Sequence, residues 1–446
     1  MYSLVEARLK CNRNIKINFK GGEISSDSGL LLVKEFAHKI GLEQIAKAIF
    51  KTKDASSCRI HKDGENLMQE IYKTIAGYFR DNDSDELIHE PVFKSILNKE
   101  ALASQPTISR FYNRMDEATL KQFEEINRLM RRQMYSIKKP SMMLFDMDST
   151  LLETYGKQEK TDFNFHYQSR GYHPLLCYDG LTRDLLKAEL RSGSTYTSTG
   201  AVDFMEPLLS EYRDLYPETD LFFRGDSGFA VPDLYKSLES RSCFYAIRLK
   251  ANNILRKQSA YLESELNEIT AHNMVDYAVV YDDFDYQANS WDIPRRVAVK
   301  IEKPYGQFTY KYTFIVTNTT MTAKDVIKFY SNRGHMENFI KESKNGFDFR
   351  TMSSQSLETN ANRLQVSMLA YNLFNWFRRI ALPKNMRKHF VDTIRLKLLK
   401  IASRVVNSGR YTTFKLCSSC PYKKEFYETL ENIHKITFDT EYVQLE

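Results

Sequence analysis

The chain has 446 residues, a formal net charge of +7, and 42% hydrophobic and 13% aromatic residues. This is more apolar material than a disordered chain carries, and the length is sufficient for several packed regions. No apolar run is long enough to span a bilayer, and Glu6, Arg8 and Lys10 interrupt the segment where a signal peptide needs an apolar core. The composition therefore excludes a disordered tail or a membrane protein and predicts a cytoplasmic globular protein.

The first 139 residues are predicted to form a helical DNA-binding region. After a short strand at 15–22, helical spacing recurs in six segments. They are 30–41, 42–50, 66–80, 91–102, 104–115 and a long stretch from Glu117. In SQPTISRFYNRM, Ser104 or Gln105 would cap a helix with Pro106 in its first turn, leaving Arg110 and Arg114 exposed. This segment resembles a DNA-reading helix, with plain helical packing as the alternative.

After Lys139 the pattern changes to alternating strands and helices, which predicts an α/β layer. Strands are expected at 141–150, 173–179, 185–193, 220–229 and 243–252, and helices at 200–216 and 232–240. Three alternating segments at 274–286, 292–303 and 307–318 predict an antiparallel insertion. The expected domains are thus 1–139 helical, 140–253 and 320–380 as two parts of one α/β core, 254–319 as a β-rich insertion, and 381–446 as a basic helical region.

Basic residues are concentrated near the C-terminus. From Lys384 to Lys424 there are eleven Lys and Arg against one acid, Asp392, so this segment carries +10 and the rest of the chain −3. A local excess of this size suggests contact with a polyanion, because phosphates attract such a face and release counterions. A solvated amphipathic helix over 390–406 is the alternative. Cys417 and Cys420 form a CxxC, but without two further ligands it is a weak zinc signal.

Two aspartates follow apolar strand-like runs. Asp148 ends MMLFDMD and Asp226 ends LFFRGD, and strand ends are where α/β folds place functional side chains. Together with Glu337 they form an oxygen-only set suited to a hard divalent cation. Two such ions activate a nucleophile and stabilise the leaving oxygen of a phosphodiester.

Glu337 lies in FYSNRGHMENFIKESKNGF, residues 329–347, which we expect to be one helix. At 100° per residue, Tyr330, Arg333, Glu337 and Lys344 share one stripe of it. An apolar stripe runs beside the polar one, so Glu337 is expected at the edge of a packed surface, pointing into a site. An amphipathic helix with an ion-paired border is the alternative.

These residues resemble the DDE-type transposases of bacterial insertion sequences, whose catalytic fold is RNase H-like. Tyr330, Arg333, Glu337 and Lys344 match the Y-x2-R-x3-E-x6-K signature of one group in full. The order of the three acids and the insertion between Asp226 and Glu337 also resemble the family pattern. The fold class expected is therefore α/β, an RNase H-like mixed sheet flanked by helices, with helical terminal regions.

The resemblance implies a function and its partners. Asp148, Asp226 and Glu337 would be catalytic and would hold two Mg²⁺ ions, with Mn²⁺ as a substitute. The enzyme would bind the terminal inverted repeats of an insertion sequence in double-stranded DNA, cleave the ends and join them to target DNA. The resemblance implies cut-and-paste movement, with a hairpin intermediate as one route for cleaving the second strand. A homodimer on DNA in the bacterial cytoplasm, associated with the nucleoid, is implied.

Further residues are expected to contact DNA. The resemblance assigns Tyr330 and Arg333 to the cleaved phosphate and Lys344 to the backbone. Charge alone adds five more, Arg350, Arg395, Lys397, Lys400 and Arg404.

Three alternatives stay open from the sequence. Asp146 lies two residues before Asp148 and on the same face of a strand, so it competes as first ligand, although the DST after Met147 favours Asp148. LFDMDST also fits haloacid-dehalogenase-like phosphatases, with Asp146 as nucleophile and Asp148 as acid/base. The third alternative is a catalytically silent DNA-binding protein of transposase descent.

Overall fold

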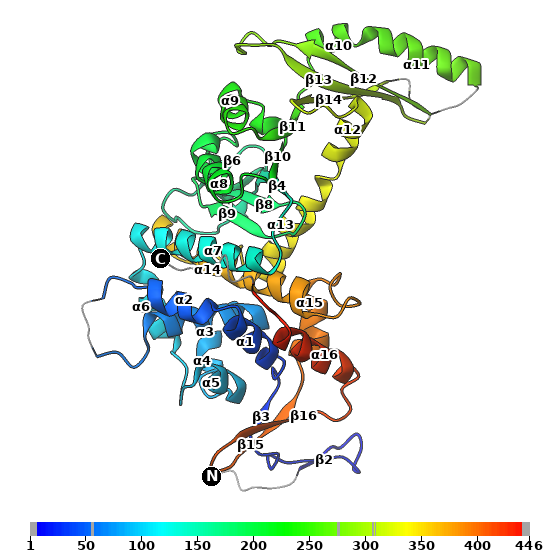
Figure 1. Ribbon diagram of the computed structural model, residues 1–446. Coiled ribbons are helices and arrows are strands. Elements are labelled where there is room, and N and C mark those ends of the chain that lie inside the picture. The colour runs from blue at the N-terminus through cyan, green and yellow to red at the C-terminus, as the bar shows by residue number, and fades with distance from the viewer. Residues whose placement is uncertain (1–6, 55–57, 274–276, 306, 308, 439–446) are drawn as a thin grey trace. The chain divides into compact units, whose positions relative to one another are not determined.

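The computed structural model describes residues 7–54, 58–273, 277–305, 307 and 309–438. The chain divides into two compact units (Figure 1). A helical unit comprises Met1–Ile137, Glu342–Thr351 and Asn362–Glu446, and a sheet unit comprises Lys138–Lys341 and Met352–Ala361. The five-part division expected from the sequence stays a prediction.

The sheet unit is built on one eight-stranded mixed sheet, ordered β12-β13-β14-β11-β10-β4-β8-β9 (Figure 1). In that order the strands are Ala278–Tyr286, Arg295–Lys303, Lys311–Thr317, Phe244–Leu249, Asp220–Gly225, Met142–Ser149, Leu175–Asp179 and Leu185–Glu189. All eight were predicted, although the first residues of the segment 274–286 lie outside the described part of the chain. The central strand β4 runs parallel to β10, and β10 runs parallel to β11.

Five of these strands form the RNase H-like core. β9, β8 and β4 form an antiparallel meander. β10 then pairs with β4 and β11 pairs with β10, both in parallel, so the chain reaches each of these two strands by a crossover connection. The connecting helices α8 (Ala201–Leu215) and α9 (Pro232–Ser240) lie at their predicted places. Parallel neighbours need such crossovers, and their carboxyl ends therefore meet at one edge of the sheet. The expected α/β class with an RNase H-like mixed sheet is confirmed.

The insertion extends this sheet. β14 pairs antiparallel with β11, and β12 and β13 follow outward. Two helices that the sequence analysis missed precede it, α10 (Asn253–Gln258) and α11 (Ala260–Asn273). After β14, Thr322 caps α12 (Ala323–Ser331) by accepting a hydrogen bond from the Asp325 amide. This helix packs on the sheet through a small buried cluster, which comprises Ala246, Ala298, Ile315, Ala323, Val326 and Ile327.

The helical unit contains the predicted N-terminal helices. They are α1 (Leu30–Lys39), α2 (Leu42–Ile49), α3 (Asp63–Ala76), α5 (Pro91–Leu97), α6 (Gln105–Asn113) and α7 (Glu117–Ile137), with the single turn α4 (Asp83–Glu86) between them. Most of α14 (Leu357–Trp376) also belongs to this unit. Phe36 of α1 packs edge-on against Phe377, with 5.7 Å between ring centroids. The strand predicted at 15–22 is shorter, because β2 spans only Lys16–Ile17 and pairs with β1 (Ala7–Arg8).

The helix predicted over 390–406 is wrong. The chain forms α15 (Val391–Ile394), one π-helical turn at Arg395–Leu399, and then the hairpin of β15 (Ser403–Asn407) and β16 (Thr412–Leu416). The Ser28 and Gly29 amides donate to the Ile401 and Leu399 carbonyls, and β15 pairs with β3 (Ile24–Ser25). These long-range bonds override the local helical spacing.

Candidate active site

Asp148 and Asp226 lie at the ends of neighbouring parallel strands. In the β4–β10 register, Arg224 lies opposite Asp146, so Asp148 and Asp226 both come two residues further along. Asp226 directly follows β10 and caps a short 3-10 turn, its Oδ1 accepting from the Gly228 amide at 2.8 Å. Both aspartates line one cavity of about 470 Å³. Its wall also includes Tyr167 and His173.

The environment of Asp148 favours its protonated form. Burial, and the nearby Asp226 carboxylate, raise the pKa of Asp148 from 3.8 to about 6, although Arg333 opposes the shift. Asp148 Oδ2 lies 3.0 Å from Arg333 Nη2. Arg333 also donates to the Met147 carbonyl at 3.1 Å, while its buried Nε has no partner among the described residues. A buried carboxylate whose pKa is shifted by a second carboxylate in the same cavity marks a candidate functional site.

Asp146 has a different surrounding from Asp148. It is fully buried, and its two oxygens each accept a hydrogen bond of 2.6 Å from Arg224, which is 3% exposed. Arg224 Nη1 donates to the Phe329 carbonyl at 2.7 Å and so ties the sheet to α12. A carboxylate closed off in this way has no access to a substrate. Asp148 lines the cavity and Asp146 does not, which argues against the phosphatase alternative, because that alternative needs Asp146 as nucleophile.

The helix expected over 329–347 is two helices. α12 ends at Ser331, a turn follows at Asn332 and Arg333, and α13 spans Gly334–Gly346. The stripe predicted from one continuous helix is therefore wrong. The turn places Arg333 against Asp148, whereas Glu337 lies in the first turn of α13 with an exposed side chain.

Tyr330 lies close enough to Asp148 and Asp226 for their charges to shift its pKa. Burial raises its pKa, and Asp226 and Asp148 add to the shift while Arg333 opposes it. Within the described residues, no group of three His, Cys, Asp or Glu side chains is close enough to hold an ion. The structure thus brings together Asp148, Asp226, Arg333 and Tyr330, and it leaves Glu337 outside the cavity lining. Lys344, on the last turn of α13, belongs to the helical unit.

The basic candidates differ in accessibility. On α6, Arg110 is exposed, whereas Arg114 pairs with Asp54 and Asp63, each at 3.4 Å. Ser104 is the N-cap residue of this helix, as expected, and Ile108 and Phe111 form its buried face.

The basic residues of the C-terminal region that were expected to contact DNA also differ in accessibility. Arg395 is only 7% exposed and donates to the carbonyls of Ile75 and Thr74, so we withdraw it as a DNA contact. Lys400 pairs with Asp27 at 2.5 Å, and Lys397 lies 3.1 Å from a His389 ring nitrogen. The remaining two, Arg350 and Arg404, are exposed.

His173 and Tyr167 are among the residues of the cavity wall that sequence reasoning missed. The Nδ1 of buried His173 lies 2.8 Å from the Thr195 carbonyl oxygen, which only accepts, so Nδ1 carries the proton. Burial lowers the pKa of His173. Burial, Asp148 and Asp226 raise the pKa of Tyr167 to about 12. The sequence signal was the density of aromatic and histidine side chains in FNFHYQSRGYH, residues 163–173.

The strand order and the acid pair define an RNase H-like protein, and the sequence defines its family. Residues 7–438 match the family model described as Transposase DDE domain group 1. The chain therefore belongs to the DDE transposases, a family of nucleases and strand transferases. No curated protein matches it. Among solved structures it is similar to a piggyBac transposase in a synaptic complex with hairpin DNA, at 12% identity and a TM-score of 0.40, over 89% of this chain and 82% of that one.

Two other expectations concern membranes and cysteines. Among the described residues no helix is both long and apolar enough to cross a membrane.

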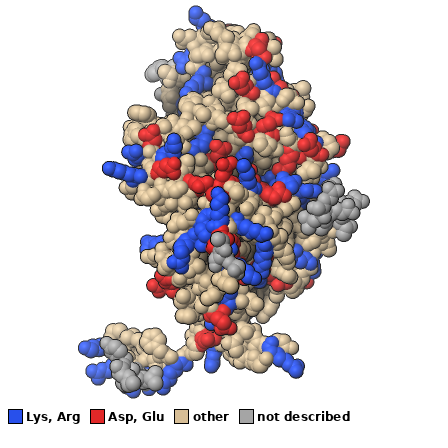
Figure 2. All heavy atoms as spheres, turned by 90° about the vertical axis from the view of Figure 1, so that its left-hand side faces the viewer, with Lys and Arg blue, Asp and Glu red and all other residues tan. Residues whose placement is uncertain are grey.

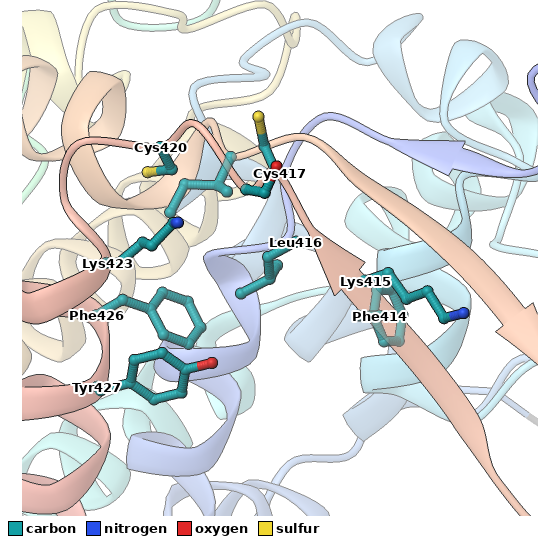
Figure 3. A pocket seen from close by; sticks show the side chains of 10 residues that line it. Phe414, Lys415, Leu416, Cys417, Cys420, Lys423, Phe426 and Tyr427 are labelled. Atoms are coloured by element: carbon teal, nitrogen blue, oxygen red, sulfur yellow. The ribbon is translucent and has the colours of Figure 1, made fainter.

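Cys417 and Cys420 line a separate cavity of about 380 Å³ with Phe426 and Tyr427 (Figure 3). Hydrogen bonds from Ser419 lower the pKa of Cys417.

DDE transposases generally use divalent metal ions, and the residues present fit one in part. Asp148 and Asp226 offer only oxygen donors, which hard cations prefer. Burial is the first cause of the raised pKa of Asp148 and the Asp226 carboxylate adds to it, so a cation between the two would stabilise their charged forms. In the part of the chain that the structure describes, no third protein ligand is in place, so the fit rests on these two carboxylates.

The raised pKa of Asp148 implies that the free energy of unfolding depends on pH. Because the pKa of Asp148 is raised to about 6, the folded protein holds this proton more tightly than the unfolded chain between pH 4 and 6. The free energy of unfolding therefore falls as pH rises through that window. Asp148→Asn removes the effect, so its stability relative to wild type should rise by at most about 3 kcal/mol from pH 4 to pH 7. Denaturant unfolding of both proteins in EDTA measures this, and a pH-independent difference would contradict it.

Proposed function

We propose that this chain is a metal-dependent DNA transposase that hydrolyses a phosphodiester at the ends of an insertion sequence and joins the freed 3′-OH to target DNA. The observation that carries the proposal is the shared cavity of Asp148 and Asp226 at the ends of two parallel strands. Two Mg²⁺ ions, or Mn²⁺, held there would activate water and stabilise the leaving oxygen. Glu337 is proposed as the third ligand, supplied when DNA orders the site.

Residues around the acid pair have separate roles in this proposal. Arg333 pairs with Asp148 through Nη2, and its Nε has no partner among the described residues. When a metal ion binds Asp148, the guanidinium would be free to donate to a phosphate oxygen of the DNA and orient it. Tyr330 would border the same phosphate. Lys344, seven residues after Glu337 on one helix face, would contact the DNA backbone.

DNA binding is proposed from the distribution of exposed basic residues. On the face in Figure 2, Lys and Arg side chains gather in a compact group near the middle. On the C-terminal hairpin, Arg404 of β15 lies directly opposite Lys415 of β16, and both are exposed. Like charges opposite each other destabilise a hairpin, and a phosphate backbone between them would relieve the repulsion. Arg110 on α6 is proposed as a second contact, and a homodimer would pair two DNA ends.

The hairpin pair gives a salt-dependence prediction. Arg404→Ala with Lys415→Ala should weaken binding to duplex DNA and lower the slope of log K against log salt by about 2, one for each lost phosphate contact. Fluorescence anisotropy from 50 to 200 mM salt measures the slope. The charge-matched control is Lys121→Ala with Lys435→Ala, since these lysines pair with Glu117 and Glu431 on helix surfaces. Equal slopes for the two double variants would rule out the hairpin as a DNA contact.

Cleavage of a labelled DNA end, with Mg²⁺ or with EDTA, tests the function itself. Wild type should nick the end only with metal, and Glu337→Gln should lower the rate by about 100-fold while binding is kept. Glu265→Gln, a change of an exposed residue on α11, is the control. Tight binding without any nicking would favour the silent descendant, and undiminished nicking by Glu337→Gln would remove it from the ligand set. A hairpin product on the flanking strand would establish the second-strand step.

A further inference from the structure

We propose that Cys417 and Cys420 form a thiol–disulfide exchange site, which reacts with a small anionic disulfide and is oxidised by it to an internal disulfide. Both cysteines line the separate cavity of about 380 Å³ in the helical unit, which does not contain the acid pair. Both are free thiols, Cys417 exposed and Cys420 partly exposed. Among the described residues no third His, Cys, Asp or Glu joins them to complete a metal site. Two accessible thiols without further ligands fit redox exchange better than zinc.

The backbone between the two cysteines holds them at a spacing that a disulfide can bridge. The Cys420 amide donates to the Cys417 carbonyl at 3.2 Å and closes a β-turn. The first and last Cα atoms of a β-turn lie less than about 7 Å apart, and a disulfide needs about 4.4–6.8 Å. The Cys417 amide donates to the Ala402 carbonyl at 2.8 Å, which anchors the turn to the β15–β16 hairpin. The two sulfurs point to different sides (Figure 3), so closing the disulfide requires rotation of the side chains within this turn.

The surroundings of Cys417 favour its thiolate, which is the nucleophilic form of a cysteine. Ser419 Oγ lies 3.1 Å from Cys417 Sγ. Hydrogen bonds from the Ser419 hydroxyl and amide lower the pKa of Cys417, and the Cys420 amide and the charge of Lys423 add to this shift. Cys417 is therefore the attacking thiol of the pair, and Cys420 is the resolving thiol.

The exchange takes place in two steps. The Cys417 thiolate attacks one sulfur of a disulfide RS–SR, so that a Cys417–SR bond forms, the RS–SR bond breaks, and the released RS⁻ takes a proton from water. Cys420 then loses its proton to water, attacks the Cys417 sulfur and releases the second RS⁻. Two protein thiols are thereby oxidised and one small disulfide is reduced to two thiols. Oxidation also removes the negative charge of the thiolate two residues from Lys415, which the hairpin prediction above assigns to DNA.

The charge of the cavity selects an anionic disulfide. Lys415 and Lys423 line it, and its described lining contains no Asp or Glu. A cavity lined by charge of one sign raises the local concentration of molecules of the opposite charge, and this attraction weakens as salt is added. Phe414, Phe426 and Tyr427 supply an apolar wall for the rest of the molecule. Carboxylates on the disulfide would therefore speed its reaction.

Peptide mass spectrometry after alkylation of the remaining thiols tests the proposal on the full chain, without DNA and in EDTA. The first probe is glutathione disulfide, which is anionic. Wild type should form the internal disulfide, and Cys417 should react about tenfold faster than Cys11, an exposed thiol of the same unit. Cys420→Ser should stop at the mixed disulfide on Cys417. Cys417→Ser should leave Cys420 unmodified over the same time.

The cationic disulfide cystamine tests the charge selection. Lys415→Gln with Lys423→Gln should lower the ratio of the glutathione disulfide rate to the cystamine rate by about tenfold, because the attraction for carboxylates is lost. In wild type the same ratio should fall between about 20 mM and about 500 mM salt. The charge-matched control is Lys121→Gln with Lys435→Gln, whose lysines pair with Glu117 and Glu431. It should keep the wild-type ratio.

The outcomes separate this inference from the proposed function. Equal rates at Cys417 and Cys11, or a mixed disulfide that persists in wild type, would overturn the exchange site. An unchanged ratio of rates in Lys415→Gln with Lys423→Gln would overturn the selection of an anionic disulfide. Because neither DNA nor cleavage enters these measurements, their failure leaves the transposase proposal as it is. A protein that exchanges with glutathione disulfide but does not nick DNA in Mg²⁺ would overturn the cleavage proposal alone.

Discussion

Asp148→Asn is expected to abolish strand cleavage, by about 10³-fold or more, in a protein that still folds and still binds DNA. The carboxylate sits beside Asp226 at the end of the central strand, and its pKa of about 6 reflects burial and like charge. The pKa of Asp148 is raised even though Arg333 pairs with it, so the site as a whole disfavours this charge and Asp148→Asn should leave the fold intact. The same change removes an oxygen donor that a divalent cation needs, and loss of metal-derived transition-state stabilisation of about 4 kcal/mol corresponds to about 10³-fold in rate.

Single-turnover nicking of a labelled end, with binding measured in parallel, tests this expectation. Asp233→Asn is the matched control, because Asp233 is an exposed acid at the start of α9, close in sequence to Asp226. It should cut at the wild-type rate. Cleavage by Asp148→Asn within tenfold of wild type would remove the acid pair from the chemistry, and loss of binding as well would mean that Asp148 mainly organises the fold.

The sheet was predictable because its strands are short apolar runs bounded by turns. MMLFDMDS carries Asp148 next to its last residue and DLFFRG leads directly into Asp226, and parallel neighbours must bring such acids to one edge. Nothing in the sequence showed the small sheet of β5 (Leu152–Glu153), β7 (Ser169–Tyr172) and β6 (Asp162–Asn164) beside the cavity. Its strands are only two to four residues long, and pairing between residues far apart in the chain fixes them, as for Leu152 and Tyr172.

The stripe on residues 329–347 failed for a local reason. The arithmetic of 100° per residue holds only within one helix, and the chain turns at Asn332 and Arg333, immediately before Gly334. The turn lets Arg333 reach Asp148 and the Met147 carbonyl. Glycine was a visible signal for a break. Charge counting failed similarly at Arg395, because a guanidinium buried among carbonyls looks the same in sequence as one facing solvent.

Asp146→Asn is expected to destabilise the sheet unit by about 3–5 kcal/mol, although it lies two residues from Asp148 on one strand. Its partner Arg224 is 3% exposed and makes two hydrogen bonds of 2.6 Å to it. An asparagine keeps the shape but leaves the guanidinium charge buried without a counter-charge, while Nη1 still donates to the Phe329 carbonyl. Removing one partner of a buried pair leaves such an uncompensated charge, which is the costly outcome.

A double substitution that removes both members of the Asp146–Arg224 pair is the control for this loss of stability. Replacing both partners by apolar residues of similar size, as in Asp146→Leu with Arg224→Met, should recover most of the lost stability, because no buried charge is left without a partner. Denaturant unfolding of the single and double variants at pH 7 measures the difference. A loss below about 1 kcal/mol in Asp146→Asn would show that water reaches this pair. Recovery of stability without recovery of cleavage would show that the bond from Arg224 to Phe329, which ties α12 to the sheet, also sets the position of Tyr330 and Arg333 at the active site.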